Sequence, residues 1–245
     1  RRRDTGSRCG TMNVTTNQAL CARRRRQALL CSGAGIAVLV TGLVLNLRSQ
    51  FGAAYLALLV GTLCSWMGVV LADRWVAIPR PDKVLQEGLK RCTGRPYHLY
   101  NWTLPPDHVL LAPWGLTVFH TMGHDGPALI DGGRWRDLRP LWRRLLRFAR
   151  RPVRHPGELV ALDLKALREA LAAKDAELAA VPVDTVVLFT HPQAKLTLQR
   201  QDAALPVLQP ADLDAWAQHA LRDRPRLAPA LRLRLEELLR ELKTR

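Results

Sequence analysis

The stretch that decides the fold is LPPDHVLLAPWGLTVFHTMGHDG, residues 104–126. Two short apolar runs, residues 109–111 and 116–119, flank the turn sequence Pro-Trp-Gly. Apolar runs of this length around a proline and a glycine are typical of two strands joined by a turn. The stretch therefore predicts a buried β-hairpin with ionisable groups at one end, where many α/β enzymes build a site. Those groups are the acid–base pair Asp107-His108 before the first strand and the cluster His120, Thr121, His124 and Asp125 after the second.

The chain around this hairpin predicts alternating helices and strands. The clearest strand is VDTVVLFT, residues 183–190, because it is apolar, β-branched and long enough to be central in a sheet. This order predicts a mixed β-sheet flanked by helices, with the α/β domain over residues 73–222 and a C-terminal helix within 223–245. The other predicted strands are residues 97–104, 129–130, 195–199 (an edge strand) and 205–208, and the predicted helices are residues 82–90, 134–154, 158–180, 212–222 and 227–242.

Two apolar segments precede the α/β domain. Residues 28–47 and 51–72 are each about 20 residues long, the length that crosses a bilayer core. Only Arg48, Ser49 and Gln50 separate them, which favours a transmembrane hairpin over residues 28–72. A signal peptide is disfavoured because its apolar region is shorter and a second span does not normally follow it. A buried helical hairpin of a soluble core is the alternative.

The flanking charges predict the orientation of the hairpin. Residues 23–26 are four consecutive arginines, and Arg74, Arg80, Lys83, Lys90 and Arg91 follow the second segment. The positive-inside rule therefore places both termini and the α/β domain on the cytoplasmic side of an inner membrane. Residues 1–27 have no hydrophobic period and predict a basic disordered tail. Met12 is a plausible start site.

Composition excludes several classes of site. The 245-residue chain has a net charge of +16 and a pI near 10.9, so nucleic acid, anionic lipid headgroups and acidic proteins are the expected partners. Its five cysteines have no C-x-x-C pair, which argues against a disulfide scaffold and a structural zinc site and fits a reducing compartment. No P-loop, G-x-G-x-x-G or G-x-S-x-G motif is present.

Residues around the hairpin resemble a known family. Glu87 lies on a predicted helix, Asp107-His108 begins an apolar strand, and Ala112-Pro113-Trp114-Gly115 leads into a second apolar strand. This pattern resembles the nuclease-related (NERD) domain of the PD-(D/E)xK superfamily. The resemblance covers residues 82–220 and implies a restriction-endonuclease-like core.

In that family an Asp and a Glu-x-Lys motif hold a divalent cation and activate water. Here His120 and Met122 stand where the Glu and Lys are expected, and imidazole and thioether are poor Mg²⁺ ligands. The resemblance thus implies a degenerate site of Glu87, Asp107 and His120, with Asp107 as the remaining metal ligand. The protein then uses no cofactor, or Mg²⁺ or Mn²⁺ if the site is active. A Zn²⁺ or Mn²⁺ site that includes His124 and a solvated polar rim are the other two interpretations.

The arginine-rich segment from residue 134 to 154 has apolar residues at helical spacing and predicts an amphipathic helix with a basic face. This face would contact nucleic-acid phosphates, with Trp135 and Trp142 available for stacking, or anionic lipid headgroups. A solvated helix whose arginines pair with nearby acids is the third interpretation. The candidate binding residues are Arg134, Arg136, Arg139, Arg143, Arg144, Arg147, Arg150 and Arg151.

Together these features predict a membrane-anchored protein with a nuclease-related domain that lacks catalytic activity. It would bind or scaffold at the inner membrane face, with DNA or RNA favoured over anionic lipid as the ligand. An active divalent-metal nuclease and a structural membrane protein without a nucleic-acid role are the alternatives.

Overall fold

The computed structural model describes residues 12–76, 79–90, 97–140, 155–200 and 205–242. Its contacts divide the chain into two compact units. One unit contains the two long N-terminal helices, and the other contains every described strand and the remaining described helices. Each unit has its own internal packing.

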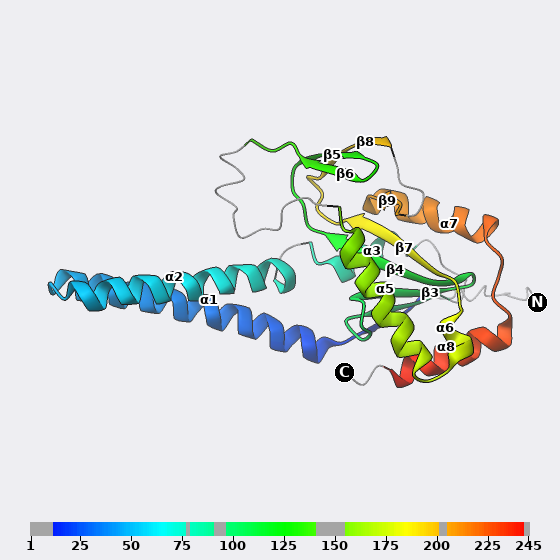
Figure 1. Ribbon diagram of the computed structural model, residues 1–245, viewed down its shortest axis with the longest axis horizontal. Coiled ribbons are helices and arrows are strands. Elements are labelled where there is room, and N and C mark those ends of the chain that lie inside the picture. Colours follow the sequence, from blue (N-terminus) through cyan, green and yellow to red (C-terminus); the bar gives the residue numbers. More distant parts are fainter. Residues whose placement is uncertain (1–11, 77–78, 91–96, 141–154, 201–204, 243–245) are drawn as a thin grey trace, which may run out of the picture. The chain divides into compact units, whose positions relative to one another are not determined.

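The helical unit is a hairpin of two long helices that lie side by side (Figure 1). Helix α1 spans Gln18–Leu47 and helix α2 spans Phe51–Trp75. The turn between them includes Ser49, whose φ of 59° is positive. Both helices are long and apolar enough to cross a membrane, in the segments Gln18–Leu47 and Phe51–Ala72.

Small residues line the contact between α1 and α2. A Cβ at Gly35 would lie 2.5 Å from the backbone nitrogen of Ser65, and a Cβ at Gly68 would lie 2.6 Å from that of Ser32. These positions accept only glycine, so the two backbones approach closely, as in many membrane helix pairs. Large apolar side chains are instead exposed on the outside of the hairpin, among them Leu29, Ile36, Val40, Leu43, Tyr55, Leu56, Leu59, Leu63 and Met67.

The prediction of a disordered tail over residues 1–27 is wrong for its described part. Strand β1 spans Asn13–Thr16, and α1 begins at Gln18, ten residues before the predicted start at Ala28. The four arginines, residues 23–26, lie within this helix. Arginine has a high helix propensity, so a run of it extends an apolar helix and does not end it.

The α/β unit is built on a six-stranded mixed sheet with the strand order β1-β2-β3-β4-β7-β9. Strands β2, β3 and β4 form an antiparallel meander, while β1, β7 and β9 join their neighbours in parallel. The strands are β1, β2 (His98–Asn101), β3 (His108–Ala112), β4 (Gly115–Met122), β7 (Val183–Phe189) and β9 (Val207–Leu208).

Helices cover both faces of this sheet (Figure 1). Side chains alternate along each strand, so Leu110 and Phe119 pack on the face with α3 and α7. Leu111 and Val118 pack on the opposite face, with α5 and α8. The predicted fold class, a mixed sheet flanked by helices, is confirmed. The helices are α3 (Pro81–Gly88), α5 (Gly157–Ala172), α6 (Ala176–Ala179), α7 (Leu213–Asp223) and α8 (Pro229–Glu241), with a 3₁₀ turn at Pro210–Asp212.

The predicted hairpin is confirmed as β3 and β4. Val109 pairs with Val118, and the pairing continues to Ala112 and Gly115 at the turn. Gly115 has a φ of +145°, and a Cβ there would lie 2.5 Å from the carbonyl oxygen of Pro182. Glycine is therefore required where the turn meets the segment that leads into β7.

A second, three-stranded sheet has the order β6-β5-β8. Strand β5 spans Pro127–Asp131, β6 spans Arg134–Asp137 and β8 spans Lys195–Arg200. β5 and β6 form an antiparallel hairpin around Gly132, whose φ is +54°, and β8 joins β5 in parallel. The predicted edge strand over residues 195–199 is confirmed as β8.

The predicted amphipathic helix over residues 134–154 is wrong at its start. Residues 134–137 form strand β6, because Arg-Trp-Arg-Asp alternates exposed and half-buried side chains with a period of two. Residues 138–140 are not helical either, and residues 141–154, the remainder of that prediction, lie outside the described residues. The predicted helix over residues 158–180 is divided into α5 and α6, because Asp175 accepts a hydrogen bond from the Glu177 nitrogen and caps a new helix.

Candidate functional site

His120 lies on β4 and faces α5. Its Nδ1 is 3.6 Å from Oδ2 of Asp163 on α5, and the two side chains are 19% and 36% exposed. This distance suits an ion pair when the imidazole is protonated. Asp163 is thus the acidic neighbour of the candidate histidine.

Glu87 does not meet His120. Helix α3, which carries Glu87, packs on the face of the sheet that holds Phe119, while His120 shares the opposite face with Val118. The Glu87 side chain is 70% exposed and lies 4.0 Å from the Lys90 ammonium. The structure therefore separates two of the three candidate catalytic residues by the thickness of the sheet.

Asp107 lies in the loop before β3. Continuing the β3–β4 register by two residues would place Asp107 opposite His120, but the recorded pairing reaches only Val109 and Val118. The Asp107 carbonyl oxygen instead accepts a hydrogen bond from the Trp102 nitrogen at 2.7 Å. Within the described residues, no three His, Cys, Asp or Glu side chains lie close enough to hold a metal ion.

The predicted acid–base pair Asp107-His108 is divided between a loop and the first residue of β3. His108 begins β3 and is fully buried, and its Nδ1 lies 2.8 Å from Oδ1 of Asn101 on β2. Asp107, one residue earlier, stays half-buried in the loop. His108 is a core residue that joins two strands.

The polar cluster after β4 is also divided. His124 was predicted on a solvated rim or in a metal site with His120, but its side chain is only 3% exposed. Its Nε2 lies 3.9 Å from Oδ1 of Asp137, which is 4% exposed, and its ring meets Phe189 edge-on. His120 and His124 thus face different carboxylates, and no shared metal site forms between them.

A further buried polar cluster joins β1, β2 and α8. The His98 ring stacks on Tyr100 with centroids 4.2 Å apart, and its Nε2 lies 2.9 Å from the Thr15 hydroxyl. Its Nδ1 lies 3.6 Å from the Glu236 carboxylate. Burial, and then the charge of Glu236, raise the pKa of Tyr100 well above its ordinary value. This cluster holds the edge of the sheet together.

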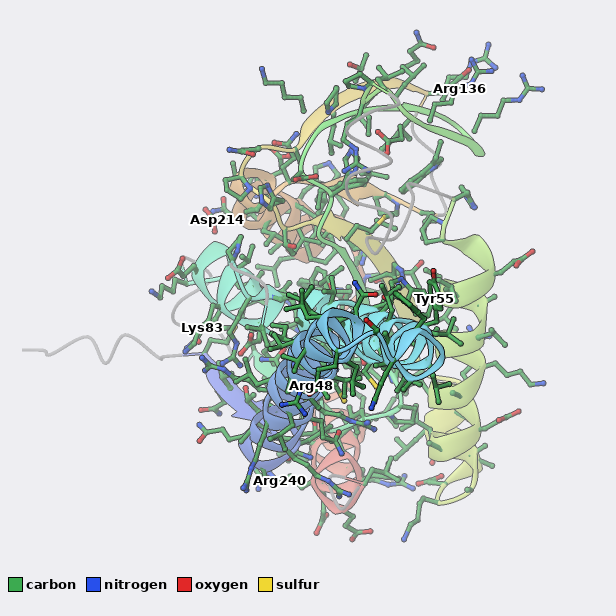
Figure 2. All side chains as sticks on the ribbon, turned by 90° about the vertical axis from the view of Figure 1, so that its left-hand side faces the viewer. Arg48, Tyr55, Lys83, Arg136, Asp214 and Arg240 are labelled. Carbon is green, nitrogen blue, oxygen red and sulfur yellow. The ribbon has the colours of Figure 1, made fainter. Side chains whose placement is uncertain are left out.

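The cationic candidates form a different surface. Arg134 and Arg136 alternate with Trp135 and Asp137 on β6, and both arginines are exposed. In the register of the small sheet, Arg136 stands opposite Leu129 and Arg134 opposite Asp131. Figure 2 shows Arg136 at the outer side of this sheet.

Strand β8 adds two cations to the same face. Lys195 stands opposite Pro127, and a β-bulge after Ile130 aligns Arg200 with Asp131. The Arg200 Nε lies 4.0 Å from Oδ1 of Asp131. We call the outward residues of the small sheet the basic face: Pro127, Leu129, Asp131, Arg134, Arg136, Lys195, Thr197 and Arg200.

The opposite side of β6 fixes this strand to the large sheet. The Trp135 ring stacks on Phe189 at 5.9 Å, with 27° between the ring planes, and meets His155 edge-on at 5.6 Å. The Trp135 Nε1 donates a hydrogen bond to the Gly132 carbonyl. Trp135, predicted as available for stacking on bases, is thus half-buried and already stacks on Phe189 within the protein.

The structure places the other predicted binding arginines as follows. Arg139 is half-buried, and Arg143, Arg144, Arg147, Arg150 and Arg151 lie outside the described residues. The prediction missed Lys195 and Arg200, although the alternation of KLTLQR indicated an edge strand with one outward side. Comparison of the chain with protein-family models, curated proteins and solved structures found no match.

Proposed function

We propose that this protein is anchored in the inner membrane by α1 and α2 and binds nucleic acid through the basic face. In this proposal the α/β unit is a binding or scaffolding module without hydrolytic activity. The exposed cations of the small sheet carry the proposal.

The surface of the helical hairpin supports the membrane anchor. Exposed leucines, valines and aromatic residues surround the pair, while glycines and serines fill the contact between the helices. A helical pair in water buries its large apolar side chains and exposes polar ones. In a bilayer the lipid tails solvate the apolar side chains, and close backbone approach holds the pair together.

The pairing of β1 with β2 supports a two-pass topology. β1 precedes α1 and β2 follows α2, yet Asn13 pairs with His98 and Thr16 with Asn101. Two strands of one sheet lie on one side of a membrane, so the chain between them crosses an even number of times. The arginines at residues 23–26 favour the cytoplasmic side for both strands.

The order of elements supports a relationship to the nuclease-related domain. The chain runs from α3 through the β3–β4 hairpin and α5 to β7, which joins β4 in parallel. This is the order that the resemblance implied, with Glu87 on the helix and Asp107 before the hairpin. Since Glu87 and His120 face opposite sides of the sheet, the proposal keeps the fold and omits the hydrolysis.

The basic face supports a polyanionic ligand. Four exposed cations and one carboxylate, that of Asp131, point outward among the described residues of this sheet. The Cα atoms of Arg134 and Arg136 lie two positions apart along an extended strand, a distance of about 6.7 Å. This spacing is comparable with that of neighbouring phosphates along a nucleic-acid strand, and each neutralised phosphate releases counterions.

Full-length protein in phosphatidylcholine nanodiscs tests the proposal. Fluorescence anisotropy with a labelled DNA duplex, repeated over a series of salt concentrations, gives the slope of log affinity against log salt. Arg134→Ala/Arg136→Ala should reduce the magnitude of this slope by about 1.8, since each phosphate contact contributes about 0.9.

Arg222→Ala/Arg226→Ala is the matched control, because both arginines are exposed at the end of α7 and just after it. The control should leave the slope unchanged. An unchanged slope in Arg134→Ala/Arg136→Ala would remove the basic face as the binding surface. No binding of DNA or RNA at low salt would refute the proposed function itself.

A further inference from the structure

We infer that the basic face contacts only the sugar–phosphate backbone, so this face binds nucleic acid without reading its bases. This inference rests on the proposed function and names the part of the ligand that the face recognises. It follows from which side chains point outward, from the width of the sheet and from the chemistry of the donors.

The outward side chains of the basic face include no aromatic ring. Single-stranded nucleic acid is held elsewhere by bases stacked on exposed aromatic side chains. The aromatic residue of β6 is Trp135, and its ring stacks on Phe189 on the inner side of the sheet. Arg134 and Arg136 on either side of it point outward. The alternation of the strand thus places the cations outside and the stacking ring inside.

The width of the sheet disfavours insertion into a groove. The major groove of B-DNA is about 12 Å wide and admits a helix or a two-stranded ribbon. Three strands at about 4.8 Å spacing are roughly 14 Å wide before side chains are added. The small sheet has three strands, with the hairpin β5–β6 flanked by β8. The basic face therefore lies across the phosphates and does not reach the base edges.

The donors on the face suit phosphates. Guanidinium and ammonium groups of Arg134, Arg136 and Lys195 are exposed, and the Thr197 hydroxyl lies on the same outward side. Arg200 is 85% exposed, and the Asp131 carboxylate at 4.0 Å offsets part of its charge. Arginine reads guanine through its bidentate fork, whereas the release of counterions from phosphates depends on positive charge and not on the fork.

A charge-preserving substitution separates the two modes of binding. Arg134→Lys/Arg136→Lys keeps both positive charges and removes both guanidinium forks. If the face contacts only phosphates, this variant should keep the salt slope of the unchanged protein, because the number of counterions released depends on charge. The alanine pair should lose about 1.8 of the slope on duplex DNA and about 1.4 on single strands.

Ligand composition gives an independent test. In the same nanodiscs, AT-rich and GC-rich duplexes of one length should bind with affinities within about twofold, and so should oligo(dA) and oligo(dT). Inorganic polyphosphate should compete with all four ligands.

A tenfold preference among duplexes or homopolymers, lost in Arg134→Lys/Arg136→Lys, would overturn the inference while leaving the proposed function intact. Binding of anionic vesicles or polyphosphate, with no binding of any nucleic acid, would instead refute the proposed function. The two failures are therefore distinguishable.

Discussion

The two sheets of the α/β unit use the same strand alternation for opposite purposes. The large sheet is covered by helices on both faces, so Leu110, Leu111 and their neighbours on β3 and β4 are fully buried. The small sheet packs one side, which includes Ile130, against Phe189 of β7, and its other side holds exposed cations. A sheet that is covered on both faces stabilises the fold, while a sheet with one open face can present charge to a ligand.

The two sheets also contain hairpins whose sequence signals differ greatly in strength. The β3–β4 hairpin holds part of the motif that resembles a nuclease, yet His108 is a core residue, and His120 faces the side of the sheet opposite to Glu87. The β5–β6 hairpin has no recognisable motif, yet it holds Arg134 and Arg136 in the open. The proposed binding surface therefore lies on the hairpin with the weaker sequence signal.

The largest expected effect tests the covered sheet against the open one. Leu110→Ala removes a fully buried side chain of β3 and should lower the free energy of unfolding by about 2 to 5 kcal/mol. Leu129→Ala, on the outward side of β5, should cost less than about 1 kcal/mol. Urea unfolding of the full chain in detergent, followed by tryptophan fluorescence, measures both. Equal losses would contradict the difference between the sheets.

A smaller effect is expected where α7 joins the turn of the β3–β4 hairpin. The Arg224 guanidinium pairs with Asp184 and lies 5.9 Å from the Trp114 ring and 5.8 Å from the Trp216 ring. Arg224→Ala should cost about 1 to 3 kcal/mol, because it leaves a half-buried carboxylate without its counter-charge. Arg226→Ala, two residues later and exposed, should be neutral. Thermal unfolding of both variants decides.

The same pair predicts a pH dependence. Burial raises the pKa of Asp184 above its ordinary value, and Arg224 opposes this shift. Folding therefore favours the protonated carboxyl of Asp184. The stability that this preference contributes is fully present below the pKa of Asp184 in the unfolded chain, and it is lost as the pH rises through the pKa in the folded protein. Arg224→Ala removes the opposing charge and should raise the folded pKa of Asp184 further. The melting temperature of this variant should therefore lie below that of the unchanged protein, and the gap should be larger at neutral pH than in acid. Adding Asp184→Asn should remove this widening.

Substitutions on the basic face should weaken binding and leave stability nearly unchanged. Arg134→Ala/Arg136→Ala should change the free energy of unfolding by less than about 0.5 kcal/mol, since both side chains are exposed. The same variant should lose nucleic-acid affinity. Unfolding and anisotropy measured on one preparation test this dissociation of stability from binding. A loss of more than 1 kcal/mol of stability would show that the arginines support the fold.

The smallest expected effect concerns hydrolysis. With Mg²⁺ or Mn²⁺ the protein should not cleave plasmid or single-stranded DNA. Asp107→Ala should likewise show no cleavage, and it should bind nucleic acid with the affinity of the unchanged protein. The reason is that Glu87 and His120 face opposite sides of the large sheet. Agarose gel electrophoresis of DNA incubated with the protein and freshly added metal ion tests this. Metal-dependent cleavage that disappears in Asp107→Ala would restore the nuclease alternative.

Elements with a local signal could be predicted from the sequence. The β3–β4 hairpin and β7 are apolar runs bounded by turn residues, and both were found close to their predicted ends. β1 was missed because its partner lies far along the chain: Asn13 pairs with His98. Nothing within a short window around residue 13 indicates that pairing.

The candidate site was harder to predict for the same reason. The alternation of β6 covers only four residues, and the helical spacing of the apolar residues that follow it outweighed this signal. Lys195 and Arg200 join Arg134 and Arg136 only through the register of β8 against β5. Glu87 and Asp107 were placed by resemblance, which carries element order but not the face of the sheet on which a side chain lies.

The pairing of β1 with β2 has a consequence for biosynthesis. β1 is synthesised first, yet its partner follows both long helices, so the sheet edge stays open until His98–Asn101 has emerged from the ribosome. If α1 and α2 form the proposed membrane anchor, a chain in which only one helix enters the bilayer would leave β1 on the far side. Its β2 edge would then remain exposed, and exposed strand edges invite aggregation and recognition by quality-control factors. In the proposed topology, the sheet is therefore completed only when both helices have been inserted.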